Sequence, residues 1–585
     1  MRSSAILKRC VTLAAALELA ACAQPTPERT PAPTLTPEPS PTATSTLTPT
    51  PTPTPTLTAA PISVSNRLRA ALLTTPVPQR GAPCGIVDIL DFPLGPPDGA
   101  GFSARWSFGR YSDRYNGIHA GEDWGWVGGD SLGQPVYSIG HGMVTYAQPL
   151  GWGVDRGVVI VRHVFPDGKT LLSFYGHLDP PSVVLKPGDC VARGDKVGAI
   201  GKPRGRPHLH FEIRTHTPDD PGPGYWPVDP RLAGWFAPSD TISDYRIQVS
   251  PGVEWMRPFT TTGSVGIGVL SDGTLAAVDG ANLIGIDPGD GRLRWSQPIS
   301  PTVHQALIDV DGAQVYLSLF TGAVQAFDAS GAALWRIELG RSNRPALMPM
   351  PGGGVVVATD RALIGVSASG GRLWQIDRAA PPFDWALDGD RLIFTTQATY
   401  AAVHTLDRDG HLRWAARLSG RIAVTGDQVF INHVNGVYRL NPETLGADLL
   451  LPLDGSALDL GQPLAMPDGG LLVPHRGSSV QRLIALTADG AIRWDKSITV
   501  FGRTLPHLLR IGDQVFALTI DGDVLSIDPD SGEARVIFDG GVGVRVPGEA
   551  SAFATADGRL LIDMRSGDFI GLDLQRASQS AGAAQ

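Results

Sequence analysis

The chain has 585 residues, too many for one ordinary domain, so we expect two or three folded units. Its net charge of −9 argues against a nucleic-acid-binding protein, and its four cysteines exclude a disulfide-rich scaffold or a multi-cysteine zinc array. The 70 glycines and 50 prolines predict many turns and few long helices.

Residues 1–21 have the pattern of a secretory signal, with basic residues at positions 2, 8 and 9 before an apolar run. This run is shorter than the roughly 20 apolar residues that a permanent membrane helix needs. The sequence LAAC at 19–22 resembles a bacterial lipobox, which implies cleavage before Cys22 and a lipid on its thiol. We therefore expect an exported protein anchored to a membrane on the extracytoplasmic side. The alternative is a plain signal peptide.

Residues 22–61 are rich in threonine and proline and contain almost no large apolar side chains, so they cannot form a core. Dense proline favours an extended spacer of about 3.1 Å per residue. We predict a disordered stalk, with an inert leader as the alternative, followed by a linker over 62–85.

Two cysteines remain in the mature chain if Cys10 leaves with the signal and Cys22 carries lipid. In an oxidising compartment, Cys84 and Cys190 can pair as a disulfide. Two separate buried thiols are the alternative.

Short β-branched runs separated by glycine and proline predict an antiparallel β domain over 86–240. His208 and His210 point to one face of a predicted strand because alternate residues of a strand share a face. His119 and Asp123 are four residues apart, with Gly121 between them.

A catalytic zinc site uses three protein ligands and keeps one position open. His119, Asp123 and either His208 or His210 can supply this set, which leaves the other histidine and His177 for proton transfer. His141, His163 and His216 lie nearby without a matching pattern, and we interpret them as structural or exposed.

The motifs HAGED at 119–123, GHL at 176–178 and PHLHFEI at 207–213 resemble those of the LytM/lysostaphin-type zinc metalloendopeptidases. The resemblance covers roughly residues 115–215 and implies a fold like the duplicated hybrid motif. It implies that His119, Asp123 and His210 bind Zn²⁺, that His177 and His208 are catalytic, and that the substrate is a peptide cross-link of bacterial peptidoglycan. Some relatives have lost these residues, so a catalytically silent cell-wall binding or activator protein is the alternative.

The second half contains a repeat of about 40 residues, marked by tryptophans at positions 255, 295, 335, 374, 414 and 494. Such a period with short alternating strands predicts the four-stranded blades of a β-propeller, here over 241–576, before a disordered tail at 577–585. We expect the indole rings to be buried between adjacent blades. Eight blades result if the strand around Trp255 completes the last one; seven is the alternative.

The tryptophan repeat resembles the pyrroloquinoline-quinone-type propeller repeats, which makes a quinoprotein oxidoreductase a further hypothesis. The propeller region has no cysteine and no obvious cluster of acidic calcium ligands, so a binding scaffold is favoured. Its ligand would be a partner protein or a wall polymer. The sequence thus predicts an all-β chain with a zinc peptidase domain followed by a propeller.

Overall fold

The computed structural model describes residues 62–63, 77–258, 265–300, 302–340, 345–377, 380–396, 401–416, 418–425, 428–453, 460–476, 481–499, 507–519, 522–540, 551–564 and 568–583. The predicted signal at 1–21, the lipidation site Cys22, the stalk at 22–61 and most of the linker lie outside these residues. Within the described parts, strands account for nearly all regular structure, which confirms the all-β class. No helix in these parts is long and apolar enough to cross a membrane.

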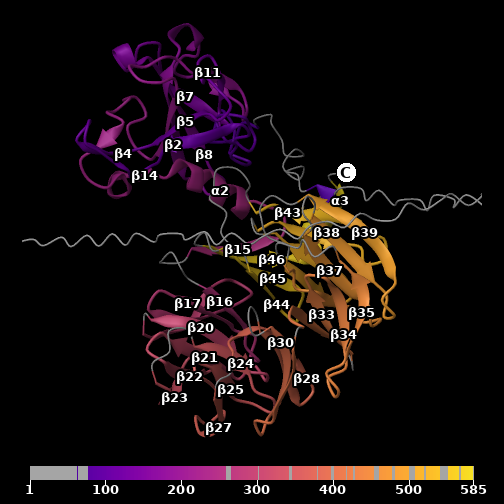
Figure 1. The fold of residues 1–585 in the computed structure, drawn as a ribbon. Helices are drawn as coiled ribbons and strands as arrows, with labels where there is room; N and C mark the ends of the chain where they lie inside the picture. Colours follow the sequence, from indigo (N-terminus) through magenta and orange to yellow (C-terminus); the bar gives the residue numbers. More distant parts are fainter. Residues whose placement is uncertain are drawn as a thin grey trace, which may run out of the picture. The chain divides into compact units, whose positions relative to one another are not determined.

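The first folded part is built on an eight-stranded sheet in which neighbouring strands run antiparallel, as predicted (Figure 1). Seven strands follow the order β10-β7-β8-β9-β12-β5-β2, and β14 pairs with β12. The strands are β2 (Phe102–Trp106), β5 (Glu122–Trp126), β7 (Gly142–Gln148), β8 (Gly157–Val164), β9 (Thr170–Leu178), β10 (Cys190–Val191), β12 (Leu209–Arg214) and β14 (Trp235–Phe236).

Two small sheets accompany this large one. One pairs β6 (Pro135–Tyr137) with β11 (Lys196–Ala199). The other places β4 (Gly117–His119) between β3 (Tyr111–Ser112) and β13 (Tyr225–Trp226). Because β4 ends at His119, this second sheet brings one predicted metal ligand to the site.

Strand β12 shows how the alternation of side chains builds both the core and the site. Leu209, Phe211 and Ile213 are almost fully buried and belong to the main hydrophobic core of this part. His210 and Glu212 are separated from them by single residues and therefore point to the opposite face. The apolar residues anchor the strand, while the polar ones are presented to the site.

Residues beyond the predicted boundaries of 86 and 240 contact the peptidase-like part. Helix α2 (Pro238–Gln248) crosses the second boundary, and its Ile242 is fully buried in the main core. Before the first boundary, Ala82 and Cys84 are buried, and Cys84 is joined to Cys190 by a disulfide. Segments on both sides of the predicted boundaries therefore contribute contacts to this part.

The second part contains eight sheets among the described residues: seven have four antiparallel strands, and one has a fifth strand that pairs in parallel (Figure 1). Seven sheets follow the chain: β16–β19 within 265–298, β20–β23 within 303–338, β24–β27 within 346–377, β28–β31 within 382–416, β32–β35 within 421–452, β36–β39 within 464–499 and β40–β43 within 507–538. A short segment, β1 (Ile62–Ser63), pairs in parallel with β39 (Ile492–Thr499).

The eighth sheet joins the two ends of this part. Strand β15 (Val253–Pro258), which carries Trp255, pairs with β46 (Asp568–Asp573). The sheet continues through β45 (Arg559–Asp563) to β44 (Ser551–Ala554). The first strand of the repeat region therefore completes the last sheet, which is the closure that the prediction of eight blades requires.

The C-terminal residues correct one prediction. We expected 577–585 to be disordered, but helix α3 spans Leu574–Ala583. Leu574, Ala577 and Ala581 are buried in one propeller cluster. Their spacing of three and four residues forms a narrow apolar face on a helix, which the small polar residues between them concealed.

The tryptophans of the repeat are not all buried as expected. Trp255 and Trp494 are buried, whereas the tryptophans at 295, 335 and 374 are partly buried. Trp414 is 62% exposed, so the prediction is wrong at this position. The turn of the following repeat has Leu445, with a side chain, where other repeats have a glycine beneath the ring.

Candidate metal centre

The pairing of three neighbouring strands brings the distant motifs together. Across the β12–β5 pair, His210 lies opposite Asp123, and across the β12–β9 pair it lies opposite Gly176, the residue before His177. Asp123, His177 and His210 are far apart in the sequence. Their proximity thus depends on the register of the sheet.

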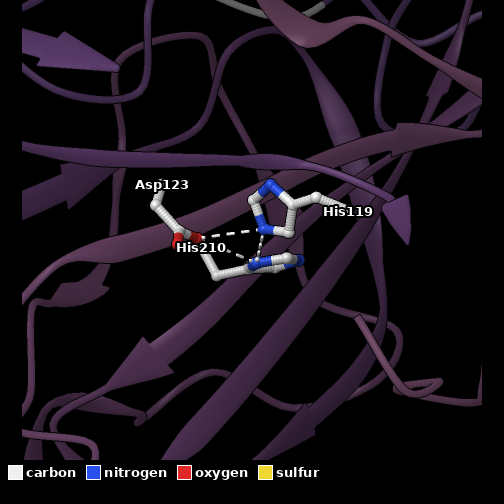
Figure 2. Close-up of side chains that lie close together, drawn as sticks. All are labelled: His119, Asp123 and His210. Carbon is white, nitrogen blue, oxygen red and sulfur yellow. Dashed lines mark hydrogen bonds and ion pairs between the residues drawn. The ribbon is translucent and has the colours of Figure 1, made fainter. Parts of the chain in front are cut away.

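Three side-chain atoms that can coordinate a metal ion form a small triangle at this point (Figure 2). His119 Nε2 lies 3.0 Å from His210 Nδ1 and 3.2 Å from Asp123 Oδ1. His210 Nδ1 and Asp123 Oδ1 are 3.1 Å apart. A tetrahedral zinc with ligand distances of 2.0–2.1 Å would separate its donors by about 3.3 Å. The residues therefore fit a zinc ion in both chemistry and spacing.

Gly121 permits this close approach. A Cβ atom at this position would lie 2.4 Å from the carbonyl oxygen of Phe211 and 3.0 Å from Nε2 of His210. A larger residue would push the HAGED segment away from β12. The glycine between His119 and Asp123 is thus a steric requirement of the site.

The second nitrogen of each ligand histidine has a partner of its own. His119 Nδ1 lies 3.2 Å from the Ser107 carbonyl oxygen, and His210 Nε2 lies 2.9 Å from Glu212 Oε1. Each partner is an acceptor, so each ring carries its hydrogen on the nitrogen that faces away from the triangle. The nitrogens that face the triangle keep lone pairs for a metal.

Electrostatics at the triangle favours a cation. Burial opposes ionisation of Asp123, but the imidazoles of His119, His208 and His210 beside its carboxylate hold its pKa well below the usual value. Burial lowers the pKa of His119. For His210, burial acts in the same direction, but the carboxylates of Asp123 and Glu212 outweigh it and raise the pKa to about 9. Without a metal the site therefore holds a proton, which a bound cation would replace.

His177 and His208 lie beside the triangle with their rings 4.6 Å apart. His177 Nδ1 donates to the Asp155 carbonyl oxygen at 2.7 Å, and His208 Nδ1 donates to that of Arg206, also at 2.7 Å. In both rings, Nε2 is therefore the nitrogen that can exchange a proton with a substrate or water. Nε2 of His208 lies 3.5 Å from Asp123 Oδ1.

His177 has two features that are common at functional sites. Its backbone φ of 61° lies in the left-handed region that β-strand residues other than glycine rarely adopt. Burial lowers its pKa to about 3, so the ring is neutral at pH 7 and Nε2 keeps its lone pair. The structure thus brings all five predicted site residues together.

The remaining histidines of this part lie elsewhere. His141 and His163 are buried in a separate polar network, and His216 packs edge-on against Trp235. We expected these three histidines to be structural or exposed, and the structure places them outside the triangle.

Two neighbours of the site were missed in the sequence. Glu212 continues the alternation of His208 and His210 along β12, a signal that the sequence does contain. Trp152, whose ring centroid lies 5.0 Å from that of His177 and 5.2 Å from that of His210, comes from a distant loop and gave no such signal.

Comparison with known proteins supports the two-part organisation. Residues 118–227 match the model of Peptidase family M23, and residues 246–382 match a family described as outer membrane protein assembly factor BamB. The chain therefore carries an M23 peptidase domain and a BamB-like, PQQ-type repeat domain, which confirms the resemblances seen in the sequence. No curated protein matches the chain.

Several solved structures resemble the chain. BamB from Moraxella catarrhalis has 18% identity and a TM-score of 0.42 over 55% of this chain and 99% of that chain. The computationally designed Ika8 protein has 13% identity and a TM-score of 0.44, with 54% and 98% covered. Quinohemoprotein alcohol dehydrogenase from Comamonas testosteroni has 14% identity and a TM-score of 0.42, with 56% and 76% covered.

Proposed function

We propose that the M23 domain is a zinc metalloendopeptidase that hydrolyses peptide cross-links of bacterial peptidoglycan. The observation that supports this most directly is the convergence of His119, Asp123 and His210 beside the histidine pair 177 and 208. The ligand set leaves a fourth position free, as hydrolytic zinc sites require. The match to Peptidase family M23 supports the same class of reaction.

A bound zinc ion would acidify water and polarise the scissile carbonyl. The chain's own contribution is to hold two imidazoles whose Nδ1 atoms donate to backbone carbonyls. One of His177 and His208 accepts the proton of the attacking water at Nε2. The other, in its doubly protonated form, donates from Nε2 to the developing oxyanion, and the proton taken from water passes to the leaving amine.

The N-terminal segments and the propeller support a role in the cell envelope. We propose export through the signal at 1–21, a lipid anchor at Cys22 and a stalk over 22–61 that carries the folded parts away from the membrane. The propeller would dock onto a protein partner or the wall polymer and so place or regulate the peptidase. We propose no nucleic-acid partner.

The test is digestion of purified wall preparations by zinc-loaded protein, with released fragments identified by mass spectrometry. Wild type should release peptides cut at cross-links, His119→Ala should lose both zinc and activity, and His208→Ala should keep zinc. A positioned general acid–base group typically contributes a factor of about 100 or more, so His208→Ala should be slower by at least that factor. If zinc-loaded wild type binds walls but releases nothing, the chain is a silent binding or activator protein instead.

A further inference from the structure

Glu212 is a fully buried carboxylate directly behind the metal ligand His210. We propose that Glu212 is a positioning residue that holds His210 in the orientation and tautomer in which Nδ1 faces the metal. This inference rests on the metal site of the proposed function, but it concerns how the site is built and does not depend on the substrate.

Three donors surround the Glu212 carboxylate. Oε2 accepts from Trp235 Nε1 at 2.9 Å and from Arg214 Nη1 at 3.2 Å, while Oε1 accepts from His210 Nε2 at 2.9 Å. The indole and the guanidinium belong to residues that are themselves almost fully buried. Two donors therefore fix one oxygen, and the other oxygen is aimed at the imidazole.

The tautomer of His210 decides whether the site can bind a metal. A neutral imidazole has one N–H, and a hydrogen on Nδ1 would occupy the lone pair that points toward His119 and Asp123. A carboxylate only accepts hydrogen bonds, so Glu212 places the hydrogen on Nε2 and leaves Nδ1 free. It also increases the basicity of the ligand ring.

The same group of contacts continues to the rim of the site. Arg214 Nη2 donates to the carbonyl oxygens of Thr217, at 3.0 Å, and Asp220. In the same loop, the carbonyl oxygen of Gly222 accepts from Trp152 Nε1 at 2.8 Å. The Glu212 carboxylate thus connects the metal ligand His210 to the core and, through Arg214, to this loop.

Glu122 offers a matched control on the neighbouring strand. It is also buried, and its Oε2 also accepts from an indole, Trp124 Nε1, at 3.0 Å. Its other hydrogen-bond partner is the hydroxyl of Ser239. Replacing either glutamate with glutamine alters a buried carboxyl group that accepts from an indole, but only Glu212 contacts a ligand histidine.

The experiment compares Glu212→Gln and Glu122→Gln in the full chain by zinc competition with a chelator at fixed pH. Loss of the hydrogen-bond partner of a ligand histidine typically weakens metal binding about 10–100-fold, so we expect a loss of about this size for Glu212→Gln and less than about twofold for Glu122→Gln. Urea unfolding of both variants checks that reduced stability is not the cause. Equal zinc affinities in the two variants would overturn the proposal.

Wild-type protein provides a second test that needs no substitution. In nitrogen-15 NMR spectra of the zinc-loaded chain, His210 should bind through Nδ1 and keep a slowly exchanging Nε2–H. Binding through Nε2 would overturn the proposal even if Glu212→Gln does not fold. If these results hold but wild type cleaves no wall peptide, the proposed function fails and the role of Glu212 stands.

Discussion

The histidines of the peptidase part show that surroundings decide what one residue type does. His210 lies between two carboxylates, and its imidazole readily holds a positive charge. His163 is equally buried, but its partners are the His141 carbonyl oxygen at 3.0 Å and the Ser173 hydroxyl at 2.7 Å. No carboxylate contacts His163 in these hydrogen bonds, so a charge on its ring is unfavourable.

Burial lowers the pKa of His163 to about 4, below the ordinary value of 6.5. The folded state therefore favours the neutral ring, and its stability falls as the pH falls from 6.5 toward 4. Between pH 7 and pH 5 this residue should reduce the free energy of unfolding by about 2 kcal/mol.

The measurement is urea unfolding at both pH values with a chelator present, so that metal loss does not contribute. His163→Gln should be less stable than wild type at pH 7 but should lose less stability on acidification. The same pH dependence in both proteins would contradict this explanation.

At the scale of elements, the outer strand of a blade is held by its tryptophan. Trp494 donates from Nε1 to the Pro529 carbonyl oxygen at 2.8 Å. Gly532 has a φ of 71°, and a Cβ there would lie 2.7 Å from the ring. In the repeat after Trp414, Leu445 occupies the positive-φ position with φ 57°, and Trp414 is exposed.

This difference predicts unequal costs for the same substitution. Trp494→Ala should destabilise the propeller by about 3–5 kcal/mol because it removes a large buried ring. Trp414→Ala should cost less than about 1 kcal/mol because most of that ring is in solvent. Denaturant unfolding of the two variants checks this, and similar losses would show that Trp414 is packed in solution.

At the scale of the whole molecule, the disulfide ties the segment before the peptidase sheet to its edge strand β10. Cys84 and Cys190 are 106 residues apart, so the bond closes a long loop. Cross-linking a loop of this length restricts the unfolded chain and is typically worth about 2–5 kcal/mol. The bond should therefore stabilise the peptidase part.

We expect the paired variant Cys84→Ser with Cys190→Ser to lose hydrogen-exchange protection in peptides from 102–236. Peptides from 265–573 should keep wild-type protection because their sheets lie outside the closed loop. Mass spectrometry of exchange in both proteins makes the comparison within one chain. Equal loss in both regions would mean that the two parts unfold together.

Much of this architecture could be predicted because its determinants are local or periodic. Blade strands pair mainly with their sequence neighbours, so a 40-residue repeat was enough to indicate a propeller and its closure through β15. The site residues were recognisable from spacing and family motifs. The choice of His210 over His208 as a ligand came from the resemblance, since spacing on one strand face permits either.

Other features depend on contacts between residues far apart in the chain, which no local pattern encodes. The triangle exists because β12 pairs with β5, whose Asp123 lies 87 residues from His210, in one register. Glu212 meets Trp235 because β14 pairs with β12. The buried face of α3 likewise needs the propeller to cover it. The 40-residue period, the spacing of the motifs and their family resemblance therefore specified the kinds of domain and the residue types of the site. Long-range strand register and packing set the distances on which the chemistry of the site depends.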